Sequence, residues 1–357
     1  MLDIRQIERL FPSVANSRDK LWSKIETLVA RGVSVDDPEF PGDELTPSDG
    51  SLFTPNEKLT GELCRKFARM VAKEHFSRDY LSLLGSAVEY GEEKHNSRTG
   101  SFTKGFINRQ ISADLTHGIP LAGLRRHFPR VAAVELAWML SGSPSIAFMQ
   151  KHKVTFWDKF ADAAGNVSAA YGERMMGPEF NNQLERSIAK LKGEPSSRQN
   201  IISFWHPGKD VTAPGDRSLV PCPIDIHWQF EKDKLSAIFH YRSSDLAVGF
   251  PVDSVRDCLF LDAMAKELGS KPGTAYWNLD DAHIYDTHLE TIRTMLQDNK
   301  KSEIVAGSFP LPRLSLSEIM ADPEAYVEIV KAKGQRAVQP DAKFRLEAVG
   351  AAAPAHP

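Results

Sequence analysis

A cysteine between two prolines is the residue whose surroundings point most directly to chemistry. Cys222 stands in the segment LVPCPIDIHWQF, at a turn into a β-rich run, where a thiol can face a cleft. A nearby arginine would enlarge the thiolate fraction, and the thiolate is the nucleophilic form of cysteine. Because a single cysteine is more often a small core residue, the segment predicts a candidate nucleophile and leaves the core role open.

An arginine and a serine stand side by side in the next segment, YRSSDLAVGFPVD. The guanidinium of Arg242 matches two phosphate oxygens, and the hydroxyl of Ser243 adds a further donor. The alternative is a surface arginine in a turn. The two segments together therefore predict a cysteine close to a site for a phosphate group.

Motifs of other catalytic classes are absent from the sequence. It contains no GxGxxG, Walker, GxSxG or HExxH motif. His283 and His288 are five residues apart, which does not place them on one helix face, and no carboxylate-rich motif accompanies them. The three cysteines are far apart and form no CxxC pair. We therefore predict no metal site, no disulfide framework and a reduced, cytoplasmic protein.

Composition argues against several classes of partner. The 357 residues include 44 Lys and Arg against 47 Asp and Glu, a net charge of −3, which argues against broad nucleic-acid binding. The most apolar segment, Val131–Leu140, contains Glu135 and falls well short of the roughly 20 apolar residues that cross a bilayer. The first residues lack a signal-peptide pattern. We therefore expect a globular protein with no membrane or nucleic-acid partner.

The elements that must position these residues predict an α+β fold. Helical periodicity is found over Val131–Leu140 and Asn181–Lys192. Short β-rich runs predict strands at Asn200–Trp205, Ile224–Phe230, Leu235–Tyr241 and Val327–Val330. Neighbouring strands mixed with helices, without regular βαβ alternation, favour α+β over a doubly wound sheet.

The first part of the chain differs in composition from the rest. Two helical stretches flank the segment from Val33 to Glu57, which is rich in proline and acidic residues and has no Lys or Arg. We predict a helical N-terminal extension with an acidic linker over 1–79, a catalytic domain over 80–349 and a flexible tail over 350–357.

An ordered series of segments resembles the thymidylate synthase family. Between about Tyr80 and Val330 these segments are KHNSRTGSF, VELAWMLSG, VTFWDKFAD, AAYGERM, SSRQNIISFW, VPCPIDIHWQF, YRSSDLAVGFPVD and WNLDDAHIYDTH. The resemblance implies a thymidylate synthase-like fold with a mixed β-sheet at a homodimer interface and shared active sites. It also implies transfer of a one-carbon unit from 5,10-methylenetetrahydrofolate to carbon 5 of a pyrimidine nucleotide.

The resemblance also assigns roles to particular residues. Cys222 matches the nucleophile that adds to carbon 6 of the pyrimidine, and Glu135 matches the glutamate that organises water and proton transfers. The nucleotide positions that it implies are Arg98, Arg242 and Ser243 at the phosphate, Arg198 donated across the dimer interface, and His283 and Tyr285 at the sugar. The folate-side positions are Trp157, Asp245 and Arg126, with Arg125 beside the last and Tyr171 in the matching YG motif.

Asp253 is the most informative departure from the family pattern, because thymidylate synthases carry asparagine there. An amide accepts from the ring NH of uracil and donates to its carbonyl, whereas an ionised carboxylate only accepts. Asp253 can instead accept from the amino group of cytosine and from a protonated ring nitrogen. The substitution resembles the cytidylate hydroxymethylase branch of the family and predicts selection of cytosine over uracil. The alternative is a surface aspartate without this role.

Other departures from the family pattern bear on the placement of water in the site and on phosphate binding. Pro223 follows the cysteine where synthases usually have histidine, Phe160 replaces a tryptophan, and Leu279–Asp280 replaces a glycine pair. Hydride transfer, which gives a methyl group, needs a closed and dry site, whereas hydration needs one positioned water. These changes favour a hydroxymethyl product. Gln199 stands in place of a second interface arginine and removes one charge from the phosphate site.

The sequence thus predicts a homodimeric (deoxy)cytidylate 5-hydroxymethyltransferase that favours dCMP. Methylation of dCMP or dUMP is the alternative reaction, and ribose CMP is the alternative substrate. A catalytically silent nucleotide- or RNA-binding protein on this scaffold is a further alternative, which the joint presence of Cys222 and Glu135 disfavours.

Overall fold

The structure is a computed structural model that describes residues 76–335, except 98, 117, 124–126, 214–218 and 300–306. Residues 1–75 of the predicted extension, the predicted tail, and Arg98, Arg125 and Arg126 lie outside the described residues. The described residues belong to a compact unit that begins at Phe76, with helical residues 76–90 ahead of the first strand. The domain boundary at residue 79 stays a prediction.

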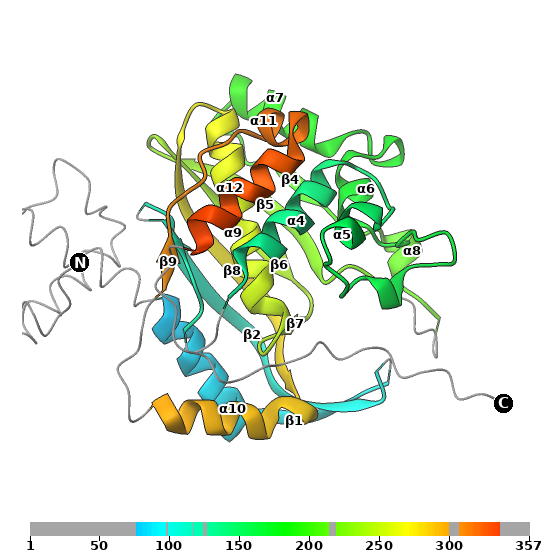
Figure 1. The fold of residues 1–357 in the computed structure, drawn as a ribbon, viewed down its shortest axis with the longest axis vertical. Helices are drawn as coiled ribbons and strands as arrows, with labels where there is room; N and C mark the ends of the chain where they lie inside the picture. Colours follow the sequence, from blue (N-terminus) through cyan, green and yellow to red (C-terminus); the bar gives the residue numbers. More distant parts are fainter. Residues whose placement is uncertain are drawn as a thin grey trace, which may run out of the picture. The chain divides into compact units, whose positions relative to one another are not determined.

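A mixed β-sheet is the frame of the described part of the chain (Figure 1). Its strands, in spatial order, are β1 (Glu92–Asn96), β2 (Ser101–Asp114), β8 (Lys271–Tyr285), β6 (Lys234–Tyr241), β5 (Pro223–Glu231) and β4 (Ile201–Ser203). The short β7 (Ser244–Asp245) also pairs with β8, and β3 (Ile119–Pro120) pairs with β9 (Ser308–Phe309). Strands β6 and β7 run parallel to β8, and the other pairs are antiparallel. The predicted α+β fold with a mixed sheet is confirmed.

Three helices stack in layers on this sheet (Figure 1). Helix α9 (Gly249–Glu267) packs on β6 and β8, α4 (Pro129–Leu140) packs on α9, and α12 (Pro323–Gln335) packs on α4. Helices α4 and α9 are buried along most of their length, as expected of helices enclosed on several sides. Buried charged residues nevertheless lie on both of them, so the α4–α9 contact is not purely apolar.

Further helices complete the described part of the chain. They are α5 (Ala147–Lys151), α6 (Tyr171–Met176), α7 (Gln183–Gly193), α8 (Pro207–Asp210), α10 (Asp286–Asn299) and α11 (Leu316–Ala321), with 3-10 turns η2 (Asp158–Phe160) and η3 (Pro178–Phe180). Helix α10 packs on β2 and β8. Among the residues that the structure describes, no helix has the length and apolar character needed to cross a bilayer.

Most of the predicted elements are present, and one is wrong. The helices predicted over Val131–Leu140 and Asn181–Lys192 correspond to α4 and α7, and the first three predicted strands correspond to β4, β5 and β6. The strand predicted over Val327–Val330 is instead part of α12. Val327 and Val330 are buried at helical spacing together with Tyr326, so one helix face rather than one strand accounts for this short apolar run.

The contact between β2 and β8 requires a glycine. Gly105 lies opposite His283 in the strand register, and a Cβ on Gly105 would overlap the Ala282 carbonyl oxygen and come within 2.7 Å of the His283 Cα. Both obstacles are backbone, so neither can rotate away. We expect Gly105→Ala to lower the free energy of unfolding by about 2 kcal/mol or more, measured by urea denaturation. Gly193→Ala is the control, because no atom lies within 4 Å of its added Cβ; equal destabilisation by both variants would contradict the expectation.

Candidate active site

The turn that carries Cys222 is held by the end of the neighbouring strand. Strand β5 begins at Pro223, opposite Tyr241 at the end of β6, so Cys222 lies next to Arg242. The Arg242 amide donates to the Cys222 carbonyl at 3.0 Å. Its guanidinium donates to the Pro221 carbonyl at 2.8 Å and to the preceding carbonyl at 3.1 Å. Cys222 is a partly exposed cysteine, fixed beside the predicted phosphate-binding arginine.

The predicted sugar-binding residues lie on β8, beside β7. Ser243 stands between β6 and β7, and within β7 Asp245 lies opposite His283 in the strand register. His283 is buried, and its Nδ1 lies 3.0 Å from Oδ1 of Asp281, which orients the ring. The Tyr285 ring meets the imidazole edge-on, with 5.2 Å between ring centroids. The phosphate-side serine therefore directly precedes β7, which pairs with the strand that carries the sugar-side histidine.

Four buried or half-buried charged residues meet at the contact between α4 and α9; we call them the carboxylate–arginine cluster. They are Glu135, Asp253, Arg256 and Asp257. Nη1 of Arg256 donates to Oδ1 of Asp253 at 2.8 Å and to Oε2 of Glu135 at 3.2 Å. The other oxygen of Glu135 accepts from the Trp157 indole at 3.0 Å. Two predicted catalytic carboxylates are thus joined through one guanidinium nitrogen.

The other side of the guanidinium is anchored to the sheet. Nη2 and Nε of Arg256 donate to Oδ1 of Asp257 at 3.0 and 3.2 Å, and Nη2 also donates to the Tyr241 hydroxyl at 2.5 Å. Oδ2 of Asp257 accepts from the Tyr241 hydroxyl at 2.8 Å and from the Trp277 indole at 2.9 Å. Because Tyr241 ends β6 and Trp277 lies in β8, the two strands fix the position of the arginine.

The surroundings of Asp253 bring the pKa of its carboxyl close to neutral pH. Burial raises the pKa of Asp253 to about 7; Arg256 opposes this rise, and the Glu135 and Asp257 carboxylates add to it. Burial disfavours the charge on Arg256, but the surrounding anions raise its pKa above its ordinary value. Three carboxylates therefore surround one cation, and the raised pKa belongs to the most exposed of them, Asp253, whose side chain is 22% exposed.

A buried tyrosine connects this cluster with the cysteine. Burial raises the pKa of Tyr171, and the nearby charges of Cys222, Asp253 and Glu135 raise it further, while Arg256 lowers it. The Tyr171 ring lies 5.6 Å from Cζ of Arg256. The charges of the predicted nucleophile, the predicted proton-handling glutamate and the predicted base-reading aspartate therefore all act on one side chain of α6.

The sequence of residues 78–322, more than half of the chain, matches the thymidylate synthase family. The chain belongs to this family. Members transfer a one-carbon unit from methylenetetrahydrofolate to a pyrimidine nucleotide, so the chain is a transferase of that type, and the family binds both nucleotide and folate. Among the described residues, no group of three or more His, Cys, Asp and Glu side chains is placed to hold a metal ion.

The folate-side residues of the family fit a pterin in their chemistry. Trp157 is buried between Trp138 and Tyr171, at centroid distances of 5.3 and 5.5 Å, so its ring is rigidly held. Oδ1 of Asp245 accepts from the Ala247 and Val248 amides at 2.9 and 3.3 Å. Its Oδ2 accepts nothing from the part of the chain that the structure describes, which leaves an acceptor for the N–H groups of a pterin.

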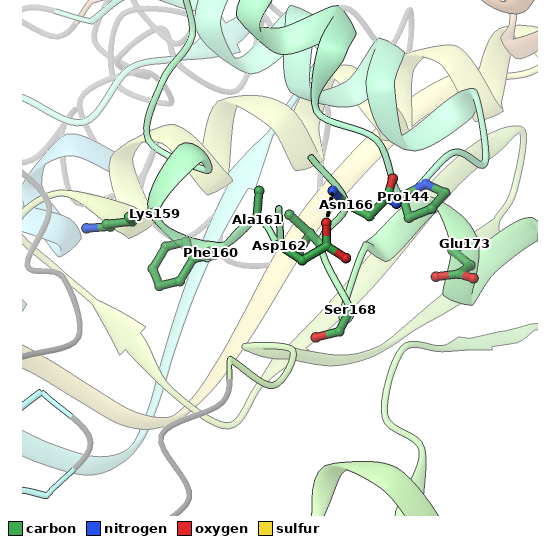
Figure 2. A pocket seen from close by; sticks show the side chains of 9 residues that line it. Pro144, Lys159, Phe160, Ala161, Asp162, Asn166, Ser168 and Glu173 are labelled. Carbon is green, nitrogen blue, oxygen red and sulfur yellow. Dashed lines mark hydrogen bonds between the residues drawn. The ribbon is translucent and has the colours of Figure 1, made fainter. Parts of the chain in front are cut away.

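A cavity of about 410 Å³ lies beside the segment that follows Trp157. Figure 2 shows Lys159 and Phe160 at one side of it and Glu173 at the other. Its lining consists of Pro144, Lys159, Phe160, Ala161, Asp162, Asn166, Val167, Ser168 and Glu173. The cavity therefore adjoins the folate-side segment, and Cys222 and the carboxylate–arginine cluster are not part of its lining.

The contacts described above do not include several of the predicted residues. Arg198 and Gln199 are exposed, in the segment between α7 and β4. Arg98 and Arg126 lie outside the described residues, so their roles stay predictions. Conversely, the sequence interpretation missed Arg256 and Asp257, which join the cluster to the sheet. Their signal is visible in SVRDCLFLDAM, where a charged pair interrupts an apolar helix.

Proposed function

We propose that this protein is a (deoxy)cytidylate 5-hydroxymethyltransferase that acts on dCMP, with ribose CMP as the alternative substrate. The observation that carries the proposal is the state of the Asp253 carboxylate. Its Oδ1 is held by Arg256, its Oδ2 receives no hydrogen bond from the described residues, and the side chain as a whole is 22% exposed. A fixed acceptor thus stands at the position where thymidylate synthases present an amide.

An acceptor at this position favours cytosine because of the donor pattern of the base. The cytosine amino group donates to an ionised carboxylate, whereas the carbonyl of uracil would face it as a second acceptor. A site that leaves a buried polar group unpaired against the wrong base discriminates strongly. Asp253 is partly buried, so this mismatch is not relieved fully by water.

In the proposed reaction, Cys222 bonds to carbon 6 of the base and carbon 5 then forms the new carbon–carbon bond. When bound, methylenetetrahydrofolate supplies the one-carbon unit at the oxidation level of formaldehyde. Carbon 5 then loses its proton as tetrahydrofolate departs without oxidation, and one water adds its oxygen to the new carbon. The Cys222–C6 bond breaks last, which restores the ring double bond and the thiolate. Both oxygens of Glu135 accept hydrogen bonds, from Trp157 and Arg256, which supports a carboxylate that orients the water and takes its proton.

We also propose a homodimer with shared sites. Arg198 is exposed just ahead of β4, the last strand on one side of the sheet, and Ile201 in that strand is 50% exposed. A second copy that covers this region would bury Ile201 and bring Arg198 to the partner's phosphate site. A cytoplasmic location is a further part of the proposal, supported by the free thiol of Cys258.

The test is competition among dCMP, CMP and dUMP with methylenetetrahydrofolate in ¹⁸O-labelled water. We expect a cytidylate product that gains CH₂O, carries ¹⁸O in the new group and appears together with tetrahydrofolate. A gain of CH₂ with dihydrofolate would contradict hydroxymethylation and establish methylation. Reaction of dUMP alone would contradict the role of Asp253 in base selection.

A further inference from the structure

Arg256 has more hydrogen-bonded anions around it than a structural ion pair needs. Its side chain is 3% exposed and contacts Glu135, Asp253 and Asp257. The buried pair of Arg174 with Asp210 shows the simpler arrangement, in which two guanidinium nitrogens meet the two oxygens of one carboxylate at 2.8 and 2.9 Å. Asp257 alone would satisfy such a pair, so the two contacts from Nη1 require a separate explanation.

Those two contacts link residues with different proposed tasks. Asp253 stands one helical turn before Arg256 on α9 and faces the base in the proposed function. Glu135 comes from α4 and handles water in the proposed function. Each is held on one oxygen by Nη1 of Arg256. The same guanidinium is fixed to the sheet through Nη2 and Nε, which donate to Asp257.

We propose that Arg256 is a positioning and specificity-determining residue, which holds the Asp253 carboxylate with one oxygen toward the base and ties its orientation to that of Glu135. The inference rests on the proposed function, because it assigns base reading to Asp253 and water handling to Glu135. It goes beyond that function by making base choice and hydration depend on one buried cation.

The charges that face Asp253 determine the expected direction of a pH effect. The charged groups are Arg256 and Asp257 on its own helix and Glu135 on α4, and the titratable hydroxyls of Tyr171 on α6 and Tyr241 on β6 also face it. Arg256 is the cation of this set. Its removal leaves burial and like charges unopposed, so the pKa of Asp253 must rise. The midpoint of a pH profile governed by Asp253 then moves upward whether the active form is the ionised or the protonated one.

The experiment compares Arg256→Gln with the wild-type protein, using the full chain and the nucleotide that the wild type consumes. We expect kcat to fall by about 100-fold, because a positioned proton-transfer group loses its partner. We expect the pH midpoint to rise by about one unit. The preference for dCMP over dUMP should also fall. Equilibrium binding of dCMP to Cys222→Ser proteins, with and without Arg256→Gln, measures the same pH midpoint in the absence of turnover.

A second variant keeps the test decisive if the glutamine variant does not fold. Arg256→Lys retains a charge, but a single ammonium cannot reach Asp257 and the Asp253–Glu135 pair together. We expect a small pH shift with a clear loss of kcat. The control is Arg313→Gln. Arg313 pairs at 3.0 Å with Asp262, which lies on α9 like Arg256 but outside the cluster. This variant should leave the pH midpoint and the base preference unchanged.

The outcomes separate this proposal from the proposed function. Variants at Arg256 with reduced stability but wild-type pH midpoint and base preference would overturn the positioning role and show a structural ion pair only. A lysine variant with wild-type kcat would overturn it as well. If the wild type uses dUMP alone, the proposed function fails, and the midpoint on dUMP still decides whether Arg256 controls Asp253.

Discussion

Replacement of Cys222 by serine is expected to abolish turnover while leaving nucleotide binding in place. In the proposed reaction the thiolate forms the bond to carbon 6, and a serine hydroxyl at the same position is a far weaker nucleophile near neutral pH. We expect kcat to fall on the order of 10⁴-fold, as for removal of other catalytic nucleophiles. The backbone contacts of the turn come from carbonyl groups of residues 220–222 and remain in the variant. Initial rates and calorimetric binding of dCMP check the two parts separately.

Cys258 offers a matched control for this prediction. This cysteine is 1% exposed within α9, and burial raises the pKa of its thiol. Cys258→Ala should therefore cost stability and keep turnover. A Cys222→Ser protein with wild-type turnover would contradict covalent catalysis and favour the silent binding protein that the sequence left as an alternative.

The Cys222→Ser variant, combined with Arg198→Ala, also tests whether the two subunits share their active sites. Arg198→Ala should weaken the phosphate site of the partner subunit, while Cys222→Ser inactivates the site of its own subunit. Mixing the two inactive or weakened proteins should restore turnover, because a mixed dimer contains one site with both wild-type residues. Absence of any recovery after subunit exchange, verified by labelled subunits, would contradict the role of Arg198 across the interface.

The local parts of the site could be predicted from the sequence because short segments encode them. Prolines around Cys222 and the β-rich run after it indicate a turn into a strand, and the structure begins β5 at Pro223. The apolar run around Glu135 indicates a buried helix, and the structure has α4 there. The same kind of reasoning gave a wrong strand prediction for Val327–Val330, because a short apolar run fits either a strand or one face of a helix.

The carboxylate–arginine cluster could not be predicted in the same way because its contacts depend on packing. Glu135 and Arg256 are 121 residues apart and meet only because α4 packs on α9. Tyr241 and Trp277 reach Asp257 only because β6 pairs with β8 and α9 lies across both. The charged pair within the apolar α9 indicated that partners must exist, since a buried charge is costly without them, but it did not identify them.

Replacement of Asp253 by asparagine is expected to change the base that the enzyme selects. The amide oxygen can still accept from Arg256, which leaves the amide nitrogen at the place of Oδ2. That nitrogen donates to the carbonyl of uracil and conflicts with the amino group of cytosine. We expect the ratio of kcat/KM for dCMP over dUMP to fall by about 10⁴-fold, since sites built on hydrogen bonds discriminate on that scale. Competition assays with both nucleotides measure the ratio directly.

The pH dependence of binding gives this prediction a second and independent measure. The ionised carboxylate is the form that accepts from the cytosine amino group, and the pKa of Asp253 is raised to about 7. Binding of dCMP to the wild type should therefore strengthen as pH rises through about 7, and Asp253→Asn should remove that dependence. Asp233→Asn is the control, because it removes an equal charge at an exposed site paired with Lys271. A variant that keeps the wild-type preference for dCMP would show that another group reads the base, since an amide held by Arg256 cannot present two acceptors.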